Sequence, residues 1–139
     1  MSHPLVARAL ADLGLRETAP NVVPGISDGD AWCSLWLCAK LRDCGIAVPD
    51  IAGARDLMIW LDAHGHDARH DAPRLPGDVC YWDRMRDGVR IGGHVSVYVE
   101  ARPRKRGRFV AGNSGPRADR VALSVHPLAR VTGAARVPG

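Results

Sequence analysis

The chain has 139 residues, of which 46% are hydrophobic, a length and composition that suit one domain with a moderate core and exclude a disordered chain. No apolar run approaches the length of a membrane span, and the start of the chain lacks the basic region and apolar core of a secretory signal. We therefore expect a protein made in the cytoplasm, without a membrane span, that reaches any other place of action by delivery. The formal net charge of +4 rests almost wholly on arginine and would suit an anionic partner such as cell wall, lipid or nucleic acid.

Helical spacing of apolar residues predicts three helices in the first half of the chain, over residues 2–13, about 31–44, and 51–63. Ser2 is expected to cap the first helix, and Asp28 or Asp30 the second. The residues expected to face the core from these helices are Leu5, Ala9, Leu10 and Leu13, then Cys33, Trp36, Leu37, Leu41 and Cys44, and finally Ala54, Leu57, Met58 and Leu61.

Short strands are predicted in the second half, over residues 79–82, 94–100, 108–111, 121–125 and 130–134. Residues 83–93 are expected to form a loop or hairpin connection with Asp87-Gly88 as its turn signal. Valines alternate with Ser, Tyr and Glu in 94–100, so one face of that strand should be buried. Residues 102–107 form a basic hairpin tip. Helices followed by an antiparallel sheet predict an α+β fold.

Four cysteines occur, at positions 33, 38, 44 and 80. The first three lie on one predicted helix, where spacings of five and six place their side chains on different faces and prevent a disulfide within the helix. No C-x-x-C pair is present, so a structural zinc site has no support. We expect free thiols in a reducing compartment. The spacing of His64, His66 and His70 is compatible with a metal, but a glycine-containing loop makes that a weak signal, and no metal or cofactor is predicted.

Cys33 falls in the first turn of its predicted helix. The partial positive charge of a helix N-terminus lowers the pKa of a thiol, and the unpaired amides there can receive an oxyanion. The alternative is a buried apolar cysteine, which is common. Cys38 and Cys44 lie inside the helix, away from this field, and are expected to be core residues.

His94 follows two glycines and begins an alternating strand, so it can face a cleft at the rim of the sheet. The alternative is a solvent-exposed histidine. Asn113 ends the next strand, where its amide oxygen could accept the imidazole N–H and hold the useful tautomer. It could equally be a turn residue, and Glu100 or Asp119 could take the orienting role. A nucleophilic Cys, a basic His and an orienting polar residue in this chain order are what a papain-like cysteine hydrolase requires.

Several short motifs follow one another between residues 32 and 113, and the overall pattern to which they belong covers about residues 5 to 137. They are Trp32-Cys33-Ser34, Ala54-Arg55-Asp56-Leu57, Leu75-Pro76-Gly77-Asp78-Val79, Gly93-His94-Val95-Ser96-Val97-Tyr98 and Gly112-Asn113. In this order they resemble the NlpC/p60-type and CHAP-type cysteine amidases and peptidases, and among them the small phage-endolysin-like branch. The chain departs from that pattern in a longer, more basic stretch at 83–93, in the tip at 102–108, and in Ala111, where a second glycine is expected.

The resemblance implies a single papain-like cysteine hydrolase domain over residues 1–139, with N-terminal helices packed on a C-terminal antiparallel β-sheet. It implies Cys33 as nucleophile, His94 as general base and Asn113 as orienting residue, with Pro76-Gly77-Asp78 structural. The implied activity is cleavage of a peptide or amide bond in the stem peptide of peptidoglycan.

Two settings fit this activity: a phage endolysin, and an antibacterial effector neutralised by a cognate immunity protein. Either would be made in the cytoplasm and act on the cell wall after delivery. The alternatives are a non-catalytic binding module on the same fold and a basic nucleic-acid-binding domain. No nucleic-acid partner is predicted, because the basic segment 102–108 lacks interleaved aromatic residues.

Overall fold

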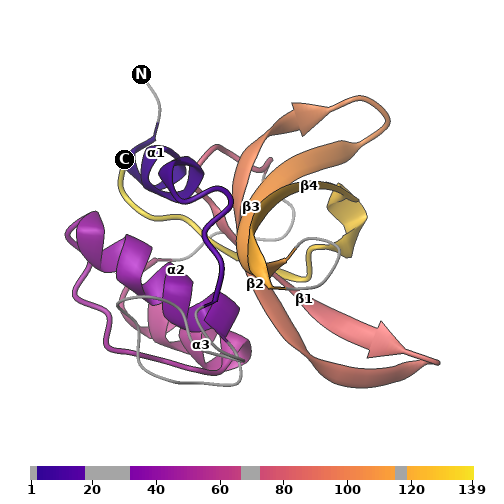
Figure 1. Cartoon of the computed structure of the whole chain (residues 1–139), viewed down its shortest axis with the longest axis horizontal. Coiled ribbons are helices and arrows are strands. Elements are labelled where there is room, and N and C mark those ends of the chain that lie inside the picture. Colours follow the sequence, from indigo (N-terminus) through magenta and orange to yellow (C-terminus); the bar gives the residue numbers. More distant parts are fainter. Residues whose placement is uncertain (1–2, 18–31, 67–72, 115–118) are drawn as a thin grey trace.

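The computed structural model describes residues 3–17, 32–66, 73–114 and 119–139. Within them, helices α1 (Pro4–Ala11), α2 (Trp32–Asp43) and α3 (Ala54–Ala63) precede strands β1 (Val79–Arg86), β2 (Val89–Arg102), β3 (Arg106–Ser114), β4 (Arg120–Pro127) and β5 (Gly133–Ala135), with the 3₁₀ turn η1 (Leu128–Arg130) before β5. The helices gather on one side of a curved antiparallel sheet with strand order β4-β3-β2-β1-β5 (Figure 1). The predicted α+β fold is confirmed.

Helix α1 is shorter than expected. Pro4 occupies the first turn, and Nδ1 of His3 accepts a hydrogen bond from the Leu5 amide at 3.1 Å, so His3 caps the helix. The predicted cap, Ser2, lies outside the described residues. Leu13, expected to face the core, lies beyond the helix end and is 44% exposed.

Helix α2 is buried around its whole circumference over Trp32–Cys38, because it lies between the other helices and the sheet. The prediction that only one side of this helix is buried is therefore wrong for Trp32–Cys38. Its proposed caps, Asp28 and Asp30, lie outside the described residues. Helix α3 begins at Ala54 after Gly53, three residues later than predicted.

Of the two alternatives expected for the stretch 83–93, a loop or a hairpin connection, the hairpin is correct. Strands β1 and β2 continue through it to the Asp87-Gly88 turn, where both residues have positive φ, +51° and +76°. Two consecutive residues with positive φ are typical of a two-residue hairpin turn, whose twist matches that of the flanking strands. The turn was predicted correctly. The strand segments on either side of it were not predicted, because the charged residues there have low strand propensity.

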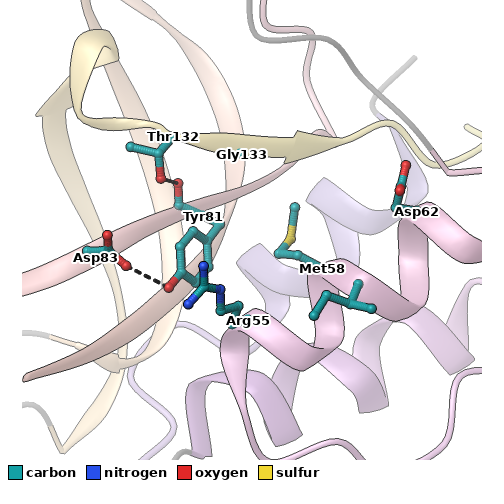
Figure 2. Close-up of a pocket in the computed structure, with 8 residues that line it drawn as sticks. Arg55, Met58, Asp62, Tyr81, Asp83, Thr132 and Gly133 are labelled. Atoms are coloured by element: carbon teal, nitrogen blue, oxygen red, sulfur yellow. Dashed lines mark hydrogen bonds between the residues drawn. The ribbon is translucent and has the colours of Figure 1, made fainter. Parts of the chain in front are cut away.

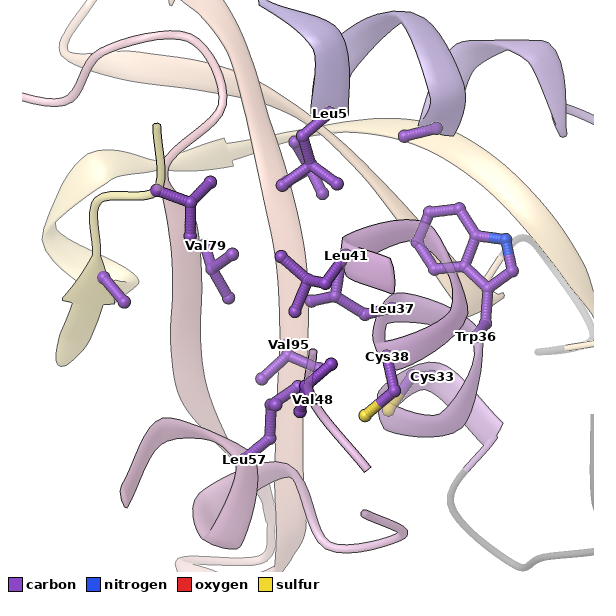
Figure 3. Packing of buried hydrophobic residues seen from close by; sticks show 14 of the residues in the cluster. Leu5, Cys33, Trp36, Leu37, Cys38, Leu41, Val48, Leu57, Val79 and Val95 are labelled. Atoms are coloured by element: carbon purple, nitrogen blue, oxygen red, sulfur yellow. The ribbon is translucent and has the colours of Figure 1, made fainter. Parts of the chain in front are cut away.

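Both faces of β2 are buried over residues 94–98, although one buried face was expected. One face places Val95 (Figure 3) and Val97 in the main core with residues of α2. The other face belongs to a second cluster of Cys80, Trp82, Tyr98 and Phe109. His94 pairs with Trp82 in the β1–β2 register. Since directly paired residues share a face of the sheet, His94 lies on the face of this second cluster.

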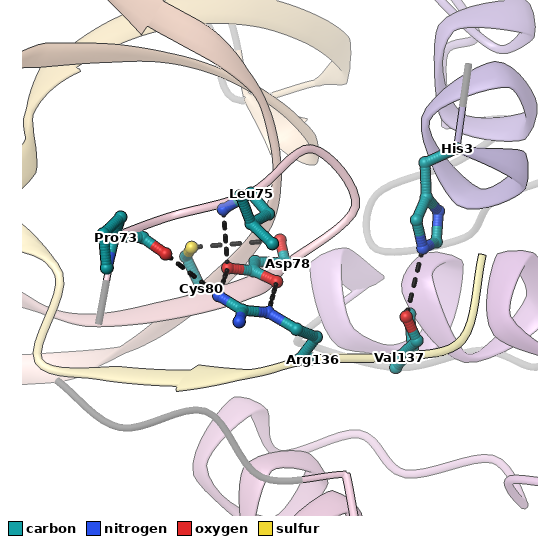
Figure 4. Close-up of polar contacts among 7 residues, drawn as sticks. All are labelled: His3, Pro73, Leu75, Asp78, Cys80, Arg136 and Val137. Atoms are coloured by element: carbon teal, nitrogen blue, oxygen red, sulfur yellow. Dashed lines mark hydrogen bonds and ion pairs between the residues drawn. The ribbon is translucent and has the colours of Figure 1, made fainter. Parts of the chain in front are cut away.

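Asp78 anchors the start of β1 (Figure 4). Its carboxylate is 1% exposed and accepts hydrogen bonds from Arg136 Nε at 3.0 Å and Nη2 at 3.1 Å, and from the Leu75 amide at 2.9 Å. The preceding Gly77 has φ of +92°, which favours glycine. Pro76-Gly77-Asp78 thus leads into β1, and the ion pair between Arg136 and Asp78 connects the C-terminal segment to this turn. None of the helices in the described part of the chain has the length and hydropathy needed to cross a bilayer.

Candidate active site

A cavity of about 470 Å³ lies where the starts of α2 and α3 meet one end of the sheet. Cys33 reaches it from α2 and Arg55 from α3, while Arg84 comes from β1 and Asn113 from the end of β3. Residues 90–93 of β2 complete the wall. Residues far apart in the sequence therefore meet around the thiol of Cys33.

Gly112 makes the approach of β3 to α2 possible. A Cβ atom at this position would lie 2.8 Å from Cζ3 of Trp32, inside van der Waals contact. Only a residue without a side chain lets the strand pass this close to the first residue of α2. The contact places Asn113 in the cavity that Cys33 also lines.

Cys33 is 2% exposed, and burial raises the pKa of its thiol above the ordinary value. The backbone amide of Val95 and the charge of Arg84 act in the opposite direction without overcoming this effect. The expectation that the helix start would lower the pKa of Cys33 is wrong for this structure, because desolvation of the charged form outweighs the helix field. At neutral pH Cys33 is a thiol.

His94 is 5% exposed, and its ring lies 5.1 Å from that of Trp82. Nη2 of Arg84 lies 2.7 Å from Nδ1 of His94. Arginine has no acceptor, so Nδ1 accepts this hydrogen bond and the ring proton is on Nε2. Burial, followed by the charges of Arg84, His126 and Arg130, lowers the pKa of His94 to about 3. His94 is therefore a neutral imidazole at neutral pH.

Asn113 has φ of +52°, in the left-handed region that asparagine tolerates, at an irregularity of the β3–β4 pairing. Its backbone oxygen accepts a hydrogen bond from Nη2 of Arg84 at 3.1 Å. Among the described residues, no hydrogen bond joins the Asn113 side chain to His94. His94 itself does not line the cavity that Cys33 and Asn113 share, and its connection to that cavity runs through Arg84.

The two alternative orienting residues are engaged elsewhere. Glu100 forms an ion pair with Arg108 at 2.9 Å, and Asp119 forms one with Arg120 at 2.9 Å. The orienting role predicted for Asn113 stays a prediction, and the structure adds Arg84 as the residue in contact with the base.

Arg84 was missed because it lies in the stretch expected to be a loop or hairpin connection, beyond the predicted end of the strand at residue 82. Trp82 and Arg84 are two residues apart in β1 and point to the same face of the sheet. Had β1 been extended past Trp82, that alternation would have placed Arg84 on the face of His94.

A second cavity of about 480 Å³ adjoins the first, and Arg55 lines both (Figure 2). Between the two cavities, the Tyr81 hydroxyl donates a hydrogen bond to Asp83 at 2.7 Å, and Nε of Arg90 donates to the same carboxylate oxygen at 2.8 Å. Arg90 also contacts the Tyr81 hydroxyl at 3.0 Å. These contacts hold Arg90 at the wall of the Cys33 cavity.

All four cysteines are free thiols. Cys38 is a buried core residue as expected, whereas Cys44, also expected in the core, follows the last residue of α2 and is only half-buried. Cys80 is buried, and burial raises the pKa of its thiol to about 12. His64 stacks on Trp60 with ring centroids 3.8 Å apart, and His70 lies outside the described residues. Within the described ranges, no group of three or more potential ligands is placed to hold a metal ion.

No family model matches the chain, and no curated protein matches it by sequence. Among solved structures the chain is similar to a protein described as similar to lipoprotein, NLP/P60 family, from Staphylococcus aureus subsp. aureus Mu50. The TM-score is 0.60 and the sequence identity 19% over 98% of this chain, which spans 41% of the length of that protein. This likeness shows a shared fold and supports the NlpC/p60-type resemblance at that level. Membership of the phage-endolysin-like branch stays a prediction.

Proposed function

We propose that the protein is a cysteine hydrolase that cleaves a peptide or amide bond in the stem peptide of peptidoglycan. The observation that carries the proposal is the cavity at the start of α2, where Cys33 and Asn113 meet and Arg84 leads to His94. The likeness in fold to an NLP/P60 protein supports the same reading.

In the proposed reaction, His94 takes the proton of the Cys33 thiol as the thiolate attacks the carbonyl carbon of the scissile bond. The S–C bond forms, and the oxyanion is received by amides at the start of α2, which have no partner within the helix. The C–N bond then breaks, and the amine leaves with the proton held by His94. Water hydrolyses the thioester and restores the thiol. Asn113 is proposed to orient the imidazole once substrate is bound.

Peptidoglycan lies outside the cytoplasm, so the proposal requires delivery of the protein to the cell wall. A phage endolysin and a secreted effector with a cognate immunity protein both meet this requirement. Binding to an immunity protein that abolishes hydrolysis would select the effector, and lysis dependent on a holin would select the endolysin.

The test is incubation of the protein with purified sacculi, followed by mass analysis of the released muropeptides. We expect fragments that identify one cleaved bond, none from Cys33→Ala, and unchanged release from Cys44→Ala as the matched control at the other end of α2. Full release by Cys33→Ala would overturn the proposal.

A non-catalytic binding module is the second candidate, and the buried, protonated state of Cys33 favours it. This function predicts that the protein co-sediments with sacculi and releases no fragment. Co-sedimentation that is equal in the wild type and Cys33→Ala, without hydrolysis by either, would select this candidate.

A further inference from the structure

Arg84 donates a hydrogen bond to Nδ1 of His94, the ring nitrogen that would have to accept a proton if His94 acts as a base. A neutral imidazole has one lone pair able to accept a proton, and in His94 that lone pair, on Nδ1, faces the guanidinium of Arg84 at 2.7 Å. While this contact persists, His94 cannot take the proton of Cys33. Hydrolysis at the site therefore requires Arg84 to move.

We propose that Arg84 is a substrate-sensing positioning residue: it holds His94 in the free protein and releases Nδ1 when a carboxylate of the substrate enters the Cys33 cavity. This inference rests on the proposed function, because it assigns a role to His94 as the base.

The contacts of Arg84 are few enough to be exchanged. Nη2 makes both hydrogen bonds, to His94 and to the backbone oxygen of Asn113. No other hydrogen bond of Arg84 is found among the described residues, so Nε and Nη1 remain available to another acceptor. Arg84 pairs with Gly92 across the β1–β2 hairpin, and a Cβ built at Gly92 would meet no atom within 4 Å. The half-buried side chain thus has open space beside it.

The charges around the cavity favour an anion. Three guanidinium groups, those of Arg55, Arg84 and Arg90, line it against the single carboxylate of Asp56. Arg90 is already paired with Asp83, whereas Arg55 makes no ion pair with another described residue. A carboxylate forms stronger, often bidentate, contacts with arginine than a neutral imidazole does. A carboxylate near Arg55 and Arg84 would therefore draw Arg84 away from His94.

The exchange leaves His94 ready to react. Its proton stays on Nε2, so the freed Nδ1 is a base that can accept a proton without a change of tautomer. The guanidinium, now neutralised by the carboxylate, no longer opposes the positive charge that the imidazole acquires. Binding of an anionic substrate and activation of the thiol become a single event, which keeps the nucleophile inert in the free protein.

The experiment measures alkylation of Cys33 by iodoacetamide at neutral pH, with the labelled cysteine identified by peptide mapping. Sodium glutarate is the carboxylate probe, and neutral glutaramide and sodium chloride of equal ionic strength are the controls. We expect glutarate to speed alkylation of Cys33 by about tenfold, the change in thiolate fraction that one unit of pKa brings, and the controls to leave it unchanged. An equal rate in glutarate and sodium chloride would overturn the proposal.

Variants of Arg84 distinguish two effects that this residue could have on alkylation: blocking His94 as a base, and stabilising the thiolate of Cys33. Arg84→Gln should alkylate faster than the wild type and lose the response to glutarate, and Arg84→Lys should restore part of that response. Arg86 is an exposed arginine of the same strand, and Arg86→Gln should behave as the wild type. Slower alkylation of Arg84→Gln than of the wild type would show that Arg84 mainly stabilises the thiolate, and would refute the proposed release.

A measurement on the unmodified protein covers the case in which Arg84→Gln fails to fold. The ring ¹⁵N resonances of His94 should report Nε2–H in the free protein, and glutarate should shift the Nδ1 resonance while leaving the proton on Nε2. A Nδ1 resonance unmoved by glutarate contradicts the proposal. None of these readouts uses peptidoglycan, so a protein that responds to glutarate and leaves sacculi intact would refute the proposed function but not the sensing role.

Discussion

Gly112 lies against the ring of Trp32 so closely that a Cβ atom at position 112 would be 2.8 Å from Cζ3 of the indole. Trp32 is 1% exposed and begins α2, and Gly112 immediately precedes Asn113. This contact sets the distance between the end of β3 and the start of the helix that carries Cys33.

Gly112→Ala should therefore disturb the site as well as the core. The added methyl must displace the buried Trp32 ring or the strand, which costs about 1–3 kcal/mol in cores that are already well packed. We expect a lower urea midpoint and slower release of muropeptides from sacculi. Gly133→Ala is the control, because its Cβ would meet its nearest neighbour at 3.7 Å, an ordinary contact. Equal stability of the two variants would contradict the account of Gly112.

Alkylation of the free protein should label Cys44 before Cys33. Burial raises the pKa of both thiols, but Cys33 is 2% exposed whereas Cys44 is partly exposed at the end of α2. Reactivity follows thiolate fraction and access. This expectation reverses the one based on helix position alone. Peptide mapping after brief iodoacetamide treatment checks it, and preferential labelling of Cys33 without any ligand would restore the helix-field interpretation.

Stability should fall in acid because of His94. Its pKa is about 3 when folded, below the ordinary value of 6.5, so the unfolded chain binds the proton more tightly between these values. The free energy of unfolding should therefore decrease as the pH falls from about 6.5 towards 3. His94→Gln should flatten this part of the profile, and His64→Gln, which alters an exposed histidine, should not. Parallel profiles for all three proteins in urea titrations would argue against a buried, neutral His94.

Arg136→Met should destabilise the fold more than Arg108→Met does. Removing Arg136 leaves the carboxylate of Asp78, which is 1% exposed, without its charged partner, at a cost of about 1.5–3 kcal/mol. Glu100, the partner of Arg108, is 49% exposed, and such surface pairs contribute about 1 kcal/mol or less. Urea denaturation of both variants measures the difference, which should vanish only if water replaces Arg136 at Asp78.

The basic β2–β3 tip should contribute to encounter with an anionic wall and not to chemistry. Arg106 begins β3 and Asn113 lies near its end, seven residues away, which at ~3.3 Å per residue is roughly 23 Å. This exceeds the Debye length of about 8 Å at physiological salt. Replacing Arg104 and Lys105 with Asn, which tolerates their positive φ, should weaken binding to sacculi at low salt and leave turnover of a soluble muropeptide unchanged. Slower turnover of the soluble substrate would place the tip in the active site.

Local rules accounted for much of the fold. Helical spacing located α2 within a residue at each end, and Asp87-Gly88 was recognised as a turn. The same rules failed for β1 and the first part of β2, because the charged residues around that turn have low strand propensity. Pairing across the hairpin overrides this propensity, and it depends on the partner strand.

Local sequence patterns predicted which reactive groups lie in regular elements and in what order: a cysteine at a helix start, then a histidine in a strand, then an asparagine at the end of the next strand. They placed His94 at the start of its strand, whereas β2 begins five residues earlier, at Val89. Their protonation states and their neighbours depend on how the elements pack against one another. The thiol pKa of Cys33 depends on how completely the surrounding elements exclude water. The hydrogen bond from Arg84 to Asn113 joins residues 29 positions apart, and no local pattern encodes it. Burial and long-range contacts set the state of Cys33 and His94, because the free energy of a charge depends on everything packed around it.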